Sequence, residues 1–362
     1  MIKICFFSGD VTRNGGTERV SVTIANELVK DDSFEVCFLS LVEQKDAPCY
    51  EIDPRIKRKA LGKKWLSPGP AYLPLIPKVR RFLKQNQIDL IIDIDIVLDV
   101  LSVPAAKGLK TKVLSWEHSN CAYELGIGYR RVILKHFTKR SDQIVTLTPG
   151  DAAAFRLLMK REDHITSIYN PASLPSETEG EGERENWLIT AARLVPGKGF
   201  DLLLQVAKEI LPKYPDWKWM LCGEGPEREM IESFCEKEGL KEQVVLLGYV
   251  PRVEDYLIRS KIFVLTSRAE GLPMCLLEAR SCGVPCVSFD VPTGPADMIE
   301  NGVNGYLIPA FDCDDMAEKL EGLMGDKERL GAMQKEAPKH MDAFLLPVVT
   351  RQWKELIESL LE

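Results

Sequence analysis

Two carboxylates flank a glycine-proline turn in the segment 268–278, RAEGLPMCLLE. Glu270 lies in the loop that precedes a predicted short helix, and Glu278 lies about two turns into that helix. The amides of Gly271 and Leu272 would point outward with the positive end of the helix dipole. Such amides suit a phosphate, and the carboxylates suit sugar hydroxyls. The pattern indicates a site for an anionic, hydroxyl-bearing ligand; the alternative is a helix whose first turn merely carries an acid.

Two cations precede this segment in the chain. Arg193 follows an apolar strand-like run, and Lys198 lies in the loop 195–199, VPGKG. At the carboxyl edge of a parallel sheet, the two could clamp a diphosphate and stabilise charge that develops on it. Gly223 begins a GEGP turn that would let the backbone approach a nucleotide closely. Each feature alone could be an ordinary surface residue, but their combination with Glu270 favours nucleotide binding.

Alternating strand and helix patterns must position these residues. Apolar runs predict strands at 187–192, 217–222, 243–247 and 262–267, and amphipathic or capped segments predict helices at 201–213, 226–238 and from 273 to a stop at 283–285. A first series of strands and helices, earlier in the chain, has strands at 2–7, 35–41, 90–94, 112–116 and 143–146, with a helix from about residue 17. Such βαβ units imply parallel sheets covered by helices. The segment 171–186, PASLPSETEGEGEREN, predicts a linker between two doubly wound α/β domains that face each other.

The first series has candidate residues of its own. Gly15 and Gly16 follow the first strand and would let a ligand approach a helix N-terminus, although they do not form the dinucleotide fingerprint. His118 follows a strand at the carboxyl edge, where ligands bind in open α/β sheets, although a lone histidine is often structural. Asp93 and Asp95 imitate a D-x-D metal motif, but they lie within an isoleucine-rich strand. That context favours a structural role over a metal site.

Composition and charge limit the classes of function. The chain has 362 residues, 45% of them hydrophobic and 28% charged, which predicts two globular domains. No apolar run approaches the length that spans a bilayer, and ten cysteines without a C-x-x-C pair predict reduced thiols in the cytoplasm. The net charge of −7 divides into +6 for residues 1–170 and −13 for the remainder. This acidic second half, together with the lack of a recognition motif, disfavours nucleic-acid binding.

A basic stretch interrupts the first series. The range Arg55–Lys84 holds ten Lys and Arg, no Asp or Glu, and several interleaved apolar residues, among them Trp65 and Tyr72. This mixture suits an anionic membrane surface. The alternative is a solvated basic loop and helix, because charge runs have low specificity.

The motifs quoted above occur together in an order that resembles the retaining glycosyltransferases of family 4, which have the two-domain GT-B fold. The resemblance covers nearly the whole chain and is weakest over 44–112. It rests on the following segments: GGTER (15–19), ARLVPGKGFD (192–201), GEGP (223–226), EGLPMCLLE (270–278), which is the E-x7-E motif, and DVPTGPADMIENGVNGYLIP (290–309).

The resemblance implies a role for each candidate in the second domain, 171–344. Arg193 and Lys198 would bind the donor diphosphate and the departing nucleotide. Glu270 would contact hydroxyls of the donor sugar, and Glu278 would hold those of the ribose. The backbone beside the sugar and phosphate would be that of Gly271, Leu272 and Pro273, and Gly223 would line the nucleotide.

In the first domain, 1–170 together with about 345–362, the resemblance implies an acceptor-binding role. Gly15 and Gly16 would cover the donor phosphates, and His118 would face the transferred sugar. The C-terminal helix, which carries Trp353 and Ile357 at helical spacing, would cross back to pack on this domain.

The resemblance also implies the reaction. A hexose or N-acetylhexosamine would move from a UDP-sugar, with retention and by front-face attack, to a hydroxyl of a lipid-linked saccharide in capsule, O-antigen or glycan assembly. No cofactor and no metal would be needed, because two cations neutralise the diphosphate. The enzyme would be cytoplasmic and held at the inner face of the membrane through Arg55–Lys84. Alternatives are a nucleotide-sugar epimerase or hydrolase of the same fold, and a non-catalytic sugar-nucleotide-binding partner.

Overall fold

The computed structural model describes residues 1–65, 70–172 and 183–362, so Leu66 of the basic stretch and most of the predicted linker lie outside the described residues. The chain divides into two compact units. The first unit comprises Met1–Pro171 and Phe344–Glu362, and the second comprises Ala172–Ala343. The C-terminal segment therefore belongs to the same unit as the N-terminus.

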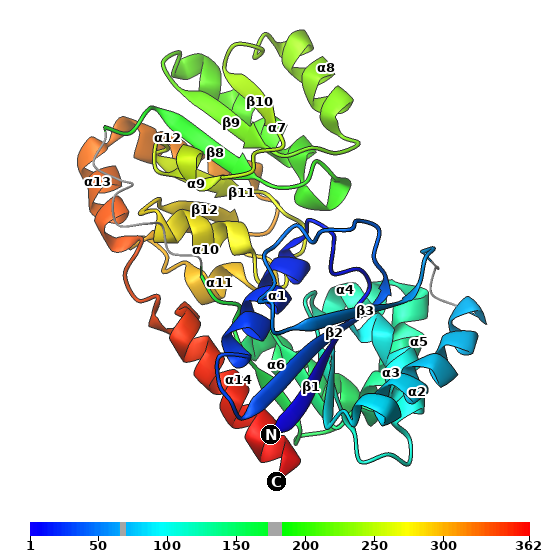
Figure 1. Ribbon diagram of the computed structural model, residues 1–362. Helices are drawn as coiled ribbons and strands as arrows, with labels where there is room; N and C mark the ends of the chain where they lie inside the picture. The colour runs from blue at the N-terminus through cyan, green and yellow to red at the C-terminus, as the bar shows by residue number, and fades with distance from the viewer. Residues whose placement is uncertain (66–69, 173–182) are drawn as a thin grey trace. The chain divides into compact units, whose positions relative to one another are not determined.

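The first unit is built on a seven-stranded parallel sheet in the order β3-β2-β1-β4-β5-β6-β7 (Figure 1). Its strands are β1 (Ile2–Ser8), β2 (Phe34–Val42), β3 (Lys57–Gly62), β4 (Leu90–Asp93), β5 (Lys112–Trp116), β6 (Gln143–Thr146) and β7 (Ile165–Ser167). The central strand β1 is apolar at consecutive positions because helices cover both faces of a parallel sheet. The strand order reverses direction between β1 and β4, which makes that pair the switch point of the sheet.

Helices connect these strands and supply the apolar faces that cover the sheet. They are α1 (Gly16–Leu28), α2 (Ile76–Asn86), α3 (Asp99–Ala106), α4 (Cys121–Gly126), α5 (Gly128–His136) and α6 (Pro149–Met159), with short 3-10 turns at Pro70–Leu75, Ile96–Leu98 and Thr138–Arg140. In α1, the residues Val20, Ile24 and Leu28 are buried at the four-residue spacing of one helix face. Because this apolar stripe packs α1 in one orientation, it also sets the direction of the helix N-terminus at the end of the loop after β1.

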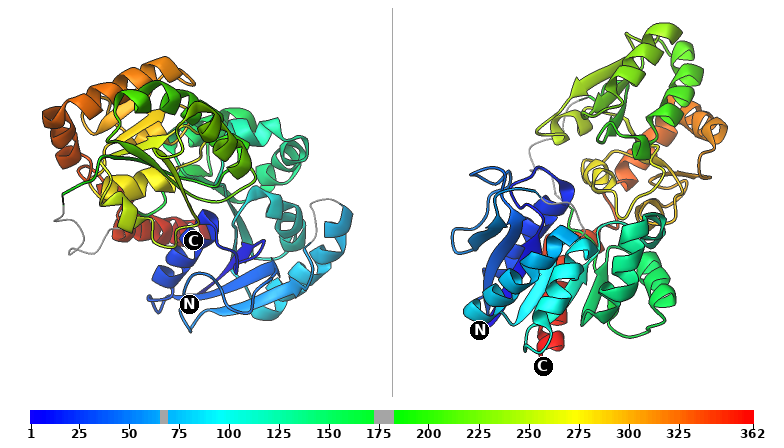
Figure 2. Two further views of the ribbon diagram at one scale, coloured as in Figure 1. Left: turned by 90° about the horizontal axis from the view of Figure 1, so that it is seen from above. Right: turned by 90° about the vertical axis from the view of Figure 1, so that its right-hand side faces the viewer.

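The last helix, α14 (Leu346–Leu361), packs on the first unit beside α1 (Figure 2). Trp353 is fully buried, and its ring lies edge-on to Trp116 with centroids 4.6 Å apart. Lys354 Nζ also contacts Asp31 Oδ2 at 2.7 Å. The prediction that the C-terminal amphipathic helix returns to the first domain is confirmed.

The second unit is a six-stranded parallel sheet in the order β10-β9-β8-β11-β12-β13. Its strands are β8 (Trp187–Ala191), β9 (Lys218–Cys222), β10 (Val244–Gly248), β11 (Ile262–Leu265), β12 (Cys286–Phe289) and β13 (Gly305–Ile308). Its helices are α7 (Phe200–Ile210), α8 (Arg228–Glu238), α9 (Glu254–Leu257), α10 (Met274–Ser281), α11 (Pro295–Met298), α12 (Cys313–Gly325) and α13 (Lys327–Glu336), with 3-10 turns at Pro196–Lys198, Leu211–Lys213 and Asp342–Phe344. Both sheets have the Rossmann-like order, so the predicted α/β fold class is confirmed; here the switch point lies between β8 and β11.

The sequence patterns missed the edge strands β3, β7 and β13. β3 has the sequence KRKALG and no buried residue, so it lacks the apolar signal of a strand. Charged side chains on an exposed edge are expected, since they discourage pairing with another sheet. The basic stretch therefore contains a strand before its helix, where the alternative interpretation allowed only a loop and a helix.

Candidate functional site

The switch point of the second unit brings Lys198 and Glu270 into contact. Lys198 follows β8, Glu270 follows β11, and the Lys198 Nζ lies 2.5 Å from the Glu270 Oε1. The Glu270 side chain is 9% exposed and the Lys198 side chain 25% exposed, so the pair is largely shielded from solvent. Thr293 Oγ1 donates to the Glu270 carbonyl and fixes the loop from the other side. The sequence named both residues but did not predict that they pair.

A second ion pair links the loop after β11 to the start of the helix that follows the β8 loop. Arg268 Nη1 and Nη2 donate to Asp201 Oδ1 and Oδ2 at 2.8 and 2.6 Å. Arg268 also donates from Nη1 to the Pro196 carbonyl, at 3.0 Å, and from its backbone amide to the Gly197 carbonyl, at 2.9 Å. The neighbouring guanidinium lowers the pKa of the Asp201 carboxyl. Sequence reasoning missed this brace, although both residues lie at the ends of the segments that it singled out.

Arg193 lies on the same loop as Lys198, directly after β8. Its side chain is exposed and makes no hydrogen bond or ion pair with the part of the chain that the structure describes. The neighbouring Leu194 is buried and exchanges backbone hydrogen bonds with the GEGP turn, to Glu224 O at 2.9 Å and from Glu227 N at 3.0 Å. Gly223 has φ +152°, and a Cβ there would lie 1.9 Å from the Ala192 carbonyl oxygen. Only glycine fits this crossing of the two loops.

Helix α10 presents its N-terminus beside the Lys198–Glu270 pair. It begins at Met274, with Pro273 as N-cap. The amides of Gly271 and Leu272 have no backbone acceptor within the described ranges and remain available to an anion. Glu278 is buried at 6% exposure. It is the fifth residue of α10, a little more than one turn from the start, so the predicted distance of two turns was too long.

The far end of α10 is anchored by Arg280, which is 2% exposed. Its guanidinium donates to the carbonyls of Ala337 at 2.9 Å, Met298 at 2.6 Å and Lys339 at 2.6 Å. Three carbonyl acceptors satisfy a buried cation that would otherwise be costly. The anchor sets the direction of the helix that carries Glu278.

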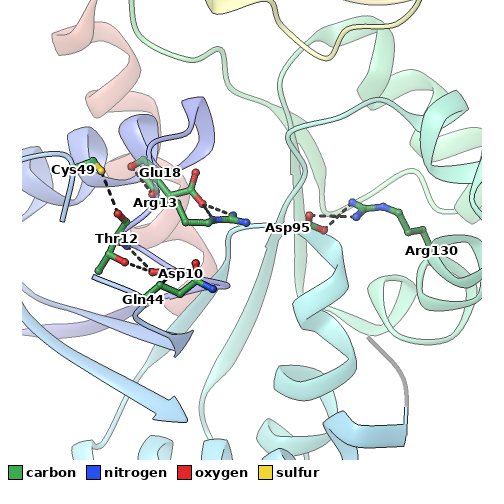
Figure 3. Close-up of polar contacts among 9 residues, drawn as sticks. Asp10, Thr12, Arg13, Glu18, Gln44, Cys49, Asp95 and Arg130 are labelled. Atoms are coloured by element: carbon green, nitrogen blue, oxygen red, sulfur yellow. Dashed lines mark hydrogen bonds and ion pairs between the residues drawn. The ribbon is translucent and has the colours of Figure 1, made fainter. Parts of the chain in front are cut away.

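In the first unit, Gly15 caps the N-terminus of α1 and Gly16 is its first residue. The Glu18 carboxylate folds back over this end: its Oε2 lies 2.2 Å from where a Cβ on Gly15 would be. Arg13 pairs with the same carboxylate, and its Nε donates at 2.9 Å (Figure 3). A chain carboxylate thus lies close to the amides to which the sequence assigned a phosphate contact.

His118 lies just beyond β5 and packs on Trp116, with ring centroids 4.4 Å apart. Its Nε2 is buried and has no hydrogen-bond partner among the residues described. Burial lowers the pKa of His118 to about 3, so the imidazole is neutral near pH 7. A neutral imidazole can donate to, or accept from, a hydroxyl.

Asp93 and Asp95 differ in burial and in the residues that they contact. Asp93 is fully buried, accepts a hydrogen bond from Ser102, and has a pKa raised by burial and by the neighbouring Asp99. Asp95 is partly exposed and pairs with Arg130. Over residues 1–65, 70–172 and 183–362, no group of three or more His, Cys, Asp or Glu is arranged to hold a metal ion.

The structure gathers most of the predicted site residues at one sheet edge of the second unit: Arg193, Lys198, Gly223, Glu270, Gly271, Leu272, Pro273 and Glu278. Gly15, Gly16 and His118 lie in the first unit. Two Rossmann-like units, the second with paired charges at its switch point, have the architecture of the GT-B class.

Comparison with known proteins agrees with this class. The model of the Glycosyltransferase Family 4 domain matches residues 14–174, and the model of the Glycosyl transferases group 1 domain matches residues 176–340. The chain belongs to these glycosyltransferases, which confirms the resemblance seen in its motifs. In the described part of the chain, every helix is too short or too polar to cross a membrane.

Relatives and a solved structure match nearly the full length. An uncharacterized glycosyltransferase of Haemophilus influenzae is 29% identical over 361 residues, 99% of this chain and 100% of the relative. An alpha-1,4-N-acetyl-D-galactosaminyltransferase of Campylobacter jejuni, whose name gives a saccharide linked to PP-undecaprenol, is 25% identical over 99% of this chain and 98% of the relative. The crystal structure of Anabaena HepE in complex with UDP has a TM-score of 0.79 at 18% identity, covering 99% of this chain and 100% of that chain.

Proposed function

We propose that this glycosyltransferase moves a hexose or an N-acetylhexosamine from a UDP-sugar to a hydroxyl of a lipid-linked saccharide, in the assembly of a bacterial surface glycan. The observation that carries the donor assignment is the Lys198–Glu270 contact at the switch point, beside the exposed Arg193 and the amides of Gly271 and Leu272. The UDP complex of HepE supports the nucleotide, and the Campylobacter relative, named for its undecaprenol-linked substrate, supports the acceptor class.

The donor would be held by charge and by hydroxyl contacts together. Arg193 and Lys198 neutralise the diphosphate, and the amides of Gly271 and Leu272, just before α10, add donors near the positive end of the helix. Glu270 keeps the Lys198 ammonium in place and offers its remaining lone pairs to the sugar hydroxyls. Glu278 holds the ribose from within α10. Because negative charge grows on the leaving diphosphate, the two cations bind the transition state more tightly than the ground state.

We assign retention of configuration to a front-face attack. The bond between the anomeric carbon and the diphosphate oxygen breaks, and a bond from that carbon to the acceptor oxygen forms on the same face. The acceptor proton passes to the departing diphosphate, so the atoms balance without an enzymic nucleophile. His118, neutral near pH 7, would contact the transferred sugar through a hydrogen bond.

Product analysis tests this proposal directly. The protein is incubated with UDP-glucose, UDP-galactose and their N-acetylated forms, together with undecaprenyl-diphosphate-linked saccharides, and products are analysed by mass spectrometry and NMR. We expect one sugar to be added in an α linkage. A β-linked product would contradict retention, and release of free sugar with every acceptor would favour a hydrolase.

No metal ion is required in the proposed reaction. Lys198 and Arg193 supply the charge that a divalent cation would supply, and Asp95 is already paired with Arg130 at 2.8 Å. We expect the initial rate of extensively dialysed enzyme to be unchanged when EDTA is added to roughly 5–10 mM. Strict dependence on manganese would contradict this proposal and return attention to Asp93 and Asp95.

The basic stretch Arg55–Lys84 is proposed as a membrane contact. Arg55 pairs with Asp53, Arg58 with Glu43, and Arg80 donates to backbone carbonyls. Other cations of the stretch are exposed, as are Trp65 at 44% and Leu73 at 61%. The exposed cations used in the test below are Lys63, Lys64, Lys78 and Arg81.

Reversal of these four charges to Glu tests the membrane contact. Each cation near an anionic surface is worth about 1 kcal/mol, so we expect recovery on vesicles rich in anionic lipid to fall at least ~10-fold. Hydrolysis of the soluble donor should be unaffected. The matched control reverses four exposed lysines elsewhere in the first unit, Lys107, Lys110, Lys135 and Lys139. Equal recovery of both variants would contradict the proposed surface.

A further inference from the structure

The first unit has a switch point of its own, between β1 and β4. Phe7 of β1 is in register with Asp93 of β4, and Ile94 N donates to Phe7 O at 2.9 Å. The loops that follow these strands, 9–15 and 94–98, therefore leave the sheet side by side at its carboxyl edge. Ligands of open α/β sheets bind between such loops. Figure 3 shows the side chains that these two loops present.

Asp95 holds an accessible carboxylate on the second loop. Arg130 Nη2 donates to its Oδ1 at 2.8 Å, and Val97 N donates to the same oxygen at 2.8 Å. The Asp95 side chain is nevertheless 42% exposed, while that of Arg130 is only 10% exposed. Asp95 also has φ +149°, a conformation that L residues rarely adopt. Arg130 Nη1 also donates to the Asp95 Oδ2, at 3.4 Å, so the guanidinium fixes the direction of a carboxylate that remains partly exposed.

An exposed indole lies over the first loop. Trp65 is 44% exposed, and its Cη2 lies 3.2 Å from where a Cβ on Gly9 would be. Arg13 Cζ lies 5.5 Å from the centroid of the same ring. The loop is rigid, because the buried Asp10 accepts hydrogen bonds from Thr12 N at 2.9 Å and from Gln44 N at 3.2 Å. A partly exposed indole that packs on such a loop suits the C–H face of a pyranose ring.

The charges around these loops favour a neutral ligand over a phosphate. Arg13 is paired with Glu18, and Arg130 is paired with Asp95, so each cation has an opposite charge in contact. In Figure 3 the Arg13 guanidinium extends toward the side on which Asp95 and Arg130 lie. An anion would have to displace one of these carboxylates. A sugar hydroxyl needs only the acceptor oxygens that the carboxylates already present.

We infer that the loops 9–15 and 94–98, together with Trp65, bind a pyranose ring of the acceptor saccharide. Asp95 accepts a hydrogen bond from a sugar hydroxyl, Trp65 packs on the ring, and Arg130 is a positioning residue that holds the Asp95 carboxylate. The inference names an acceptor contact and rests on the proposed function. It requires nothing of the donor site in the second unit.

Saturation-transfer NMR tests the inference with pooled methyl α-pyranosides of glucose, galactose and their N-acetylated forms, in the presence of UDP. We expect at least one glycoside to bind the wild type. Asp95→Asn and Trp65→Ala should each weaken that binding about 10-fold or more, as expected for a lost charge-assisted hydrogen bond or a lost aromatic contact. Trp65→Phe should restore most of it, and Arg130→Lys should bind better than Arg130→Met.

The matched control is Asp142→Asn. Asp142 also pairs with a cation, Lys112 at 3.1 Å, and accepts from a backbone amide, Val113 N at 2.9 Å, but it lies at the amino edge of the same sheet. Glycoside binding by this variant should equal that of the wild type. Trp65→Ala keeps the test decisive if Asp95→Asn unfolds, because the Trp65 side chain is partly exposed.

Two results would overturn the inference: no glycoside binds the wild type, or binding survives both Asp95→Asn and Trp65→Ala. The donor site is tested separately with Lys198→Ala, which should lose UDP and keep the glycoside. If the wild type does not bind UDP, the proposed donor assignment is wrong. The glycoside result still decides whether the loops 9–15 and 94–98 bind a sugar.

Discussion

Lys198→Ala is expected to lower the rate of sugar transfer by about 10²–10³-fold, the usual cost of removing one contact to developing negative charge. The ammonium is held 2.5 Å from Glu270 and is three-quarters shielded, so water and salt screen it weakly. Its loss also leaves the Glu270 carboxylate without its cation beside a diphosphate, which repels the donor. The decisive readout is kcat with saturating UDP-sugar and acceptor, together with the Kd for UDP.

The matched control for Lys198→Ala is Lys208→Ala. Lys208 lies in α7 of the same unit and pairs with Glu238 at 3.0 Å, but its side chain is 56% exposed and away from the switch point. We expect its rate to stay within about twofold of the wild type, since exposed pairs contribute little. A Lys198→Ala enzyme that retains more than about a third of the wild-type rate would contradict the phosphate role.

Glu270→Ala is expected to lower kcat by about 10²-fold, because it removes both the predicted sugar contact and the carboxylate that orients Lys198. The enzyme should still bind UDP, since UDP lacks the transferred sugar that Glu270 would contact. Kinetics with the full donor and calorimetry with UDP separate the two effects. Transfer by Glu270→Ala at the wild-type rate would mean that Glu270 neither contacts the donor sugar nor orients Lys198 during the reaction.

The pair should also be energetically coupled. Because Lys198 and Glu270 contact each other, the double variant is expected to be little slower than Lys198→Ala alone, rather than slower by the product of both losses. The same cycle on Lys208 and Glu238 supplies the control and should be additive within about 0.5 kcal/mol. Additive losses at Lys198 and Glu270 would mean that the two residues act independently.

The sequence predicted the fold well because most of its strands are buried. Continuous apolar runs such as 2–7 and 262–267 become central strands, and the loops after them carry the polar residues that the patterns singled out. The patterns missed the edge strands β3, β7 and β13, and also the short interior strand β12. β3 has no buried residue and β7 is three residues long, so neither carries the periodic signal on which a prediction depends.

The site was predicted in its parts but not in its connections. Lys198 and Glu270 are 72 positions apart, and only the strand order, with β8 beside β11, brings their loops together. The brace between Arg268 and Asp201 depends on the same order. Local sequence patterns contain no information about which parallel strands are neighbours, so the pairing of the charges could not be derived from them.

Asp93 and Asp95 show how little the spacing of two residues says about their surroundings. Their isoleucine-rich context favours a structural role for both over a D-x-D metal site. The structure places Asp93 in the core and Asp95 at the rim, paired with Arg130 from α5. Neither the ion pair nor the position of Trp65 beside Gly9 could be predicted from spacing, because each joins two segments that are far apart in the sequence.

The central claim is that the switch point of the second unit binds the diphosphate of a uridine nucleotide. Thermal-shift titration of the wild type and of Lys198→Ala with UDP, GDP and ADP tests it most directly. We predict that UDP stabilises the wild type selectively, and that the shift disappears in Lys198→Ala while Lys208→Ala keeps it. If no nucleotide stabilises the wild type, or if the UDP shift persists without Lys198, the phosphate clamp is wrong, and the fold and family alone remain.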